Sequence, residues 1–126
     1  MTDAWIPGGR TVTSDNTNTT TVDRITFASD TGVASVRGNL PTIQVDHAGV
    51  GNTTDGWFSG GNDGSLNVFS GIHRIIFSND LSAALRRGNV TTSVGVVLTS
   101  TGNATDAWIV GSGVTRLTFS NDTVNT

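Results

Sequence analysis

Apolar and polar side chains alternate along short runs of the chain, and turn-forming residues separate these runs. In the run near residue 25, Ile25 and Phe27 fall on one face, while Arg24 and Thr26 fall on the other. Alternation with a period of two predicts half-buried β-strands. We expect strands at 3–7, 22–28, 32–37, 42–50, 55–59, 71–78, 82–87, 91–99, 106–110 and 114–120.

These runs belong to a repeat. A Thr-Asp-x-Trp motif recurs with its tryptophans 52 and 51 positions apart, and an Arg-x-x-Phe motif follows each copy. Self-similarity at about 50 residues predicts a repeat architecture. We expect one repeat domain, 1–126, with units at about 1–52, 53–103 and an incomplete 104–126. The predicted structural anchors are Trp5, Trp57, Trp108, Arg24, Arg74, Arg116, Phe27, Phe77 and Phe119.

Composition narrows the fold class and the partners. All seven basic residues are Arg and all ten acidic residues are Asp, while Thr, Ser, Asn and Gly fill the polar positions. This usage favours strands and turns over helices and predicts an all-β protein. A net charge of −3 with dispersed arginines predicts no nucleic-acid partner. The sequence also predicts no membrane span and no signal peptide, and it has no cysteine.

The order of motifs resembles a family. Trp-Phe-Ser-Gly-Gly at 57–61, Arg-Ile-Ile-Phe-Ser-Asn-Asp at 74–80 and Arg-Gly-Asn at 87–89 are similar to degenerate kelch repeats, particularly those of tailed-phage structural proteins. The resemblance implies four-stranded blades of a β-propeller, of which the chain holds about two and a half. It also implies that the runs at 42–50 and 91–99 are the innermost strands of the second and third units.

An incomplete propeller leaves strand edges open, and open edges attract further strands. We therefore expect completion by oligomerisation or by a partner chain. Simple ring closure does not follow from the sequence, because the strands missing at the two ends are not complementary. A different arrangement of stacked β-layers is the alternative fold.

The chemistry-bearing residues favour structural roles. His47 and His73 lack the spacing of a zinc site or a catalytic pair, so we expect no catalytic residue, metal or cofactor. The recurring arginines lie near recurring aspartates, which predicts ion pairs between strands or blades. The loops 10–21 and 60–71 vary between units, which predicts recognition surfaces there. Their candidate binding residues are Asp15, Asn16, Asn62, Asp63, Ser65 and Asn67.

The first functional hypothesis is a non-enzymatic structural protein of a phage virion, in a tail, fibre or capsid surface. The resemblance implies virion localisation and partners among copies of the chain or other virion proteins. The alternative is a carbohydrate-binding adhesin or lectin-like module that contacts a host surface glycan through the variable loops. A third hypothesis, an enzyme that uses Asp46 or Asp63, is disfavoured because the other acids recur as parts of the repeat.

Overall fold

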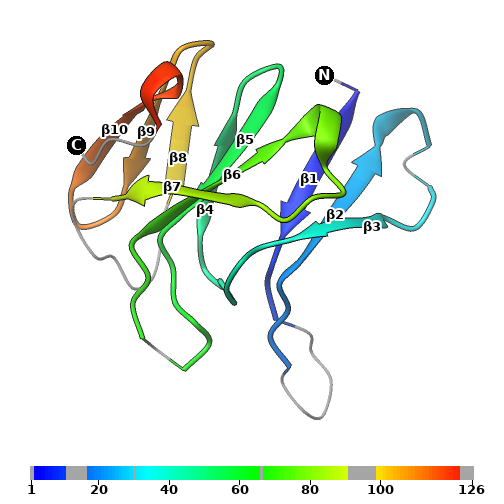
Figure 1. The fold of residues 1–126 in the computed structure, drawn as a ribbon, viewed down its shortest axis with the longest axis horizontal. Helices are drawn as coiled ribbons and strands as arrows, with labels where there is room; N and C mark the ends of the chain where they lie inside the picture. Colours follow the sequence, from blue (N-terminus) through cyan, green and yellow to red (C-terminus); the bar gives the residue numbers. More distant parts are fainter. Residues whose placement is uncertain (1, 11–16, 30, 66, 91–98, 123–126) are drawn as a thin grey trace.

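The computed structural model describes residues 2–10, 17–29, 31–65, 67–90 and 99–122, which form three antiparallel β-sheets (Figure 1). The first sheet contains β1 (Asp3–Pro7), β2 (Thr21–Thr26) and β3 (Ser35–Asn39). The second contains β4 (Ala48–Gly51), β5 (Asp55–Ser59), β6 (Gly71–Ile76) and β7 (Leu85–Asn89). The third contains β8 (Thr99–Gly102), β9 (Asp106–Val110) and β10 (Val114–Thr118). The prediction of an all-β protein is confirmed.

The sheets do not coincide with the sequence repeat. Each tryptophan lies in β1, β5 or β9, and the strand before the tryptophan motif joins the sheet of the unit that follows it. Thus β4 pairs with β5 and β8 pairs with β9, although 42–50 and 91–99 close the preceding sequence units. The second sheet therefore has four strands in the order β4-β5-β6-β7, while three are described in each neighbour.

Several strands are shorter than the alternation predicted. A 3₁₀ turn begins at the phenylalanine after β2, β6 and β10, so Phe27 does not extend the strand face of Ile25. In the second sheet the backbone N–H of Phe77 donates to the Thr54 carbonyl at 2.9 Å, directly beyond the last paired residues of β5 and β6, Asp55 and Ile76. The predicted 32–37 and 82–87 strands lie a few residues later, at β3 and β7. Most of the predicted strand 91–99 falls outside the described residues.

Side chains pack mainly between neighbouring sheets. One cluster joins Val22 and Leu40 of the first sheet to Phe58 and Ile75 of the second. The other cluster joins the second sheet to the third and contains Trp57, Ile72, Val90, Ala107, Ile109, Leu117 and Phe119. Figure 1 shows the second sheet between the other two, with the β1–β3 sheet and the β8–β10 sheet at opposite ends. The core is therefore a series of contacts between successive sheets.

Two consecutive glycines follow both β1 and β5. The second glycine of each pair, Gly9 or Gly61, has different neighbouring atoms in the two sheets. Gly9 and Gly61 both have positive φ, at 107° and 85°. A Cβ at Gly61 would collide with the Val45 carbonyl oxygen, whereas a Cβ at Gly9 would have no described atom within 4 Å. Only glycine adopts such a backbone without strain.

We predict that Gly61→Ala lowers the free energy of unfolding more than Gly9→Ala does. Both substitutions place a side chain at positive φ, which costs about 1–2 kcal/mol. Gly61→Ala also displaces the backbone bridge between Val45 and Asn62, which adds about 1–3 kcal/mol. Urea denaturation measures both variants, and equal losses would contradict the close packing at Gly61.

Candidate functional site

Tryptophan and arginine form a cross-strand pair in every sheet. The register places Trp5 opposite Arg24, Trp57 opposite Arg74 and Trp108 opposite Arg116. Directly opposed side chains on an antiparallel sheet lie on the same face and within reach of each other. The sequence spacing between the two residues varies from 19 to 17 to 8, yet the register is the same. The repeat therefore presents one indole and one guanidinium together on each sheet.

In the first two sheets this pair binds an aspartate from the next sheet. The Trp5 indole Nε1 donates to Asp80 Oδ2 at 2.8 Å, and Arg24 Nη1 lies 3.4 Å from the same oxygen. Arg37, 13 residues after Arg24, donates to Asp80 Oδ1 through Nε at 3.0 Å and through Nη2 at 2.9 Å. Asp80 is 3% exposed. One carboxylate thus connects all three strands of the first sheet to the turn of the second.

The same arrangement joins the second sheet to the third. Trp57 Nε1 donates to Asp122 Oδ2 at 2.8 Å, and Arg74 Nη1 donates to that oxygen at 3.2 Å. Arg87 Nε donates to Asp122 Oδ1 at 2.8 Å. Asp122 is 2% exposed. We call each set of one tryptophan, two arginines and one aspartate a carboxylate clamp.

An aromatic stack accompanies each carboxylate clamp. The Trp5 and Phe77 rings lie 3.9 Å apart at 8°, and the Trp57 and Phe119 rings lie 4.1 Å apart at 9°. Each phenylalanine is three residues before the clamped aspartate, so a single turn supplies both the ring and the carboxylate. Aromatic pairs contribute about 0.5–1.5 kcal/mol beyond the area that they bury. The turn is therefore held by an apolar contact and by a charged contact at once.

The clamps keep both aspartates ionised. Burial by itself raises the pKa of Asp80, but hydrogen bonds from Arg37 and Trp5, with the charges of Arg37 and Arg24, lower it by more. Burial likewise raises the pKa of Asp122, and hydrogen bonds from Arg87 and Trp57 with the charges of Arg74 and Arg87 outweigh it. A carboxylate whose pKa falls on folding stabilises the fold above its unfolded pKa, which is about 4.

The outer members of the repeat lie in different surroundings. Phe27 is 54% exposed, whereas Phe119 is 8% exposed. The Arg116 side chain is 60% exposed, whereas the Arg24 and Arg74 side chains are 29% and 22% exposed. The Arg116 guanidinium lies 3.0 Å from Asp106 Oδ1 and 6.0 Å from the centroid of the Trp108 ring. Trp108 is half-buried, and Trp57 is 1% exposed.

The two histidines lie near a buried glutamine. His73 is fully buried, and its Nδ1 lies 3.0 Å from Gln44 Oε1. Gln44 Nε2 donates to the Gly60 carbonyl at 2.6 Å, so it ties the turn after β5 to β6. The ring of His47 meets the Phe58 ring edge-on at 6.0 Å. Burial lowers the pKa of both histidines, and His73 is the more strongly affected.

The predicted binding residues of loop 60–71 bond largely to their own turn. Asp63 accepts from the backbone N–H groups of Ser65 and Asn67 at 2.8 and 3.2 Å and from the Asn67 amide at 2.7 Å. Asn62 is 2% exposed and donates to Asp46 at 2.9 Å. The predicted binding residues Asp15 and Asn16 lie outside the described residues.

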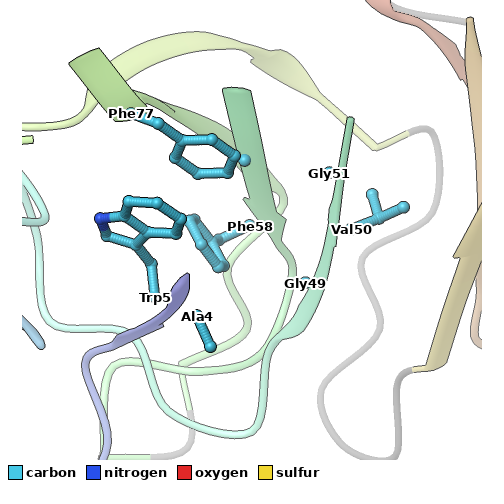
Figure 2. Close-up of a pocket in the computed structure, with 8 residues that line it drawn as sticks. Ala4, Trp5, Gly49, Val50, Gly51, Phe58 and Phe77 are labelled. Atoms are coloured by element: carbon cyan, nitrogen blue, oxygen red, sulfur yellow. The ribbon is translucent and has the colours of Figure 1, made fainter. Parts of the chain in front are cut away.

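An apolar hollow of about 250 Å³ lies between the first and second sheets (Figure 2). Figure 2 shows the stacked rings of Trp5 and Phe77 beside Phe58 on one side and the backbone of Gly49 to Gly51 on the other. At the matching place between the second and third sheets, Val50 of β4 packs against the core cluster.

Neither a metal site nor a similar protein assigns a function to the chain. Among the described residues, no three His, Cys, Asp or Glu side chains are grouped as a metal site requires, and no helix in those ranges has the length and apolar character to cross a membrane. No protein-family model matches the chain, and none of the curated proteins compared with it is similar. The resemblance to kelch repeats of phage proteins stays a prediction from the motifs.

We predict that Asp80→Asn lowers the free energy of unfolding by about 2 kcal/mol, because the part-buried Arg37 and Arg24 lose their charged hydrogen bonds to Asp80, and Arg24 keeps only its longer contact with Asp3. Asp23→Asn is the matched control, since it removes the same charge and no side-chain hydrogen bond or ion pair of Asp23 is found within the described ranges. The control should change stability by less than about 0.5 kcal/mol. Urea denaturation at neutral pH measures both, and similar losses would refute the clamp's stabilising role.

The pH dependence of stability should carry a contribution from His73. Its burial, with the charges of Arg86 and His47, lowers its pKa from 6.5 to about 4. The unfolded chain therefore binds this proton at higher pH than the folded chain, so stability should fall as pH drops from 6.5 to 4 and level off below. The full span corresponds to about 3 kcal/mol.

His73→Thr tests that contribution, because the matching position of the third sheet is the buried Thr115. The slope of unfolding free energy between pH 6.5 and 5, where the unfolded carboxylates remain mostly ionised, should be smaller in the variant. An unchanged slope would assign the dependence to other groups.

Proposed function

We propose that the chain is a non-enzymatic structural protein that acts through protein–protein assembly, and that its three sheets are consecutive blades of a kelch-like propeller. The observation that carries the proposal is the pair of carboxylate clamps. Each uses a buried ionised aspartate, two arginines and a tryptophan to join one sheet to the next. The tryptophans, arginines and aspartates of the two clamps are recurring polar and charged residues of the repeat, and each of them holds one sheet to the next.

The propeller arrangement is supported by the strand order. The second sheet is a four-stranded antiparallel meander, and its first strand, β4, contacts β8 of the third sheet. The Ser100 hydroxyl donates to the Gly49 carbonyl at 2.6 Å across this contact. First strands that lie side by side near a common centre are what a propeller requires.

The virion is the proposed setting. The motif resemblance points to tailed-phage structural proteins, and it is an association that the joints between sheets make physically reasonable. Repeats that stack through identical contacts build extended structures from small units. The partners in this proposal are further copies of the chain and other proteins of a tail, a fibre or a capsid surface.

Mass spectrometry of gradient-purified phage particles tests the setting. Peptides of the chain should be present at a constant ratio to the major capsid protein across independent preparations. The matched sample is the particle-free fraction of the same infected cells, in which the ratio should vary. Detection in that fraction alone would overturn the virion assignment.

A further inference from the structure

The two ends of the sheet series carry opposite halves of the same contact. The first sheet ends β2 with Phe27–Ser29, the turn that in the second and third sheets supplies the stacked phenylalanine. The third sheet carries Trp108 opposite Arg116, the pair that in the first and second sheets receives this turn. Phe27 is 54% exposed, and in the other half the Arg116 side chain is 60% exposed while Trp108 is half-buried.

We propose that Phe27 of one copy stacks on Trp108 of a second copy, so that the chain associates head to tail. The proposal deepens the assembly function above, because it names the surface and the partner. The two contacts inside the chain are its templates, with ring separations of 3.9 and 4.1 Å and nearly parallel planes. The second copy provides the same residue types in the same sequence context, Arg-Ile-Thr-Phe at 24–27 against Arg-Leu-Thr-Phe at 116–119.

Charge favours the same occupant. In both internal contacts the tryptophan and the first arginine receive a carboxylate that follows the phenylalanine by three residues. Arg116 lies beside the Trp108 ring and pairs with Asp106 of its own sheet, as Arg24 lies near Asp3 while it also binds Asp80, so its largely exposed guanidinium can bind such a group as well. The sequence after Phe27 continues as Ala-Ser-Asp, matching Ser-Asn-Asp after Phe77 and Phe119. A polypeptide turn with one aromatic ring and one acid is therefore the chemistry that this surface recognises.

A contact between two different surfaces repeats until it closes. The described parts of two copies joined at both ends would contain six sheets. Propellers typically contain about four to eight blades, so a dimer is the smallest closed product of suitable size. Each contact between copies uses one arginine of the described chain where the internal clamps use two, so it should be weaker than the contacts within the chain.

Two complementary variants test the proposal in the full chain. Phe27→Ser removes the exposed ring and leaves Trp108 intact, while Trp108→Ala does the reverse. Analytical ultracentrifugation should show that the wild-type chain forms dimers that dissociate on dilution, and that each variant alone weakens association at least about tenfold. An equimolar mixture of the variants should recover a species of about twice the 13.0 kDa chain mass, because one intact contact remains.

Controls separate this contact from other causes. Val33→Ser removes a fully exposed apolar side chain from the same end of the molecule and should associate like the wild type. Arg116→Gln, at a largely exposed side chain, weakens the same surface should Trp108→Ala fail to fold. A monomeric wild type, undiminished association of Phe27→Ser, or a mixture that stays monomeric would overturn the proposal. A monomeric chain that is nevertheless present in purified particles would refute only this contact and leave the structural function standing.

Discussion

The structure depends on placing an ionised carboxylate between two sheets and satisfying it there. Asp80 and Asp122 are almost completely buried, and each is held by an indole N–H and two guanidinium groups from the preceding sheet. Taking a charge out of water is unfavourable unless charged hydrogen-bond partners replace the water. Because those partners come from three strands of one sheet, the aspartate fixes both the spacing and the orientation of the next sheet.

This requirement explains features that otherwise look independent. The interval of 13 residues between Arg24 and Arg37, repeated between Arg74 and Arg87, brings two arginines from neighbouring strands to one carboxylate. The 3₁₀ turn after each second hairpin strand turns the phenylalanine out of its strand and toward the neighbouring tryptophan. Specificity between sheets is thus encoded in a few positions, while the rest of the interface is apolar packing.

The sequence predicted the all-β fold and most strand positions, because alternation and turn residues are local signals. The recurrence of arginine and aspartate also predicted ion pairs between strands or blades, and the pairs of Arg24 with Asp80 and of Arg74 with Asp122 confirm it. The sequence did not show that a tryptophan and a second arginine bind the same carboxylate, since Ser-Asn-Asp also has an ordinary explanation as a turn. The constant spacing of 13 and the need of each indole N–H for a partner were the signals that could have identified the clamp. The difference between the Phe27 and Phe119 environments could not be predicted, because it depends on which neighbouring sheet is present.

The segment between each tryptophan and its cross-strand arginine has a further consequence. The spacing falls from 19 to 17 to 8 positions, yet the register of the two strands is the same in all three sheets, and the same clamp residues meet in the first two. The length of the loop within this segment therefore does not determine how the two strands pair. Over evolutionary time this loop can lengthen or shorten without changing the contacts between one sheet and the next.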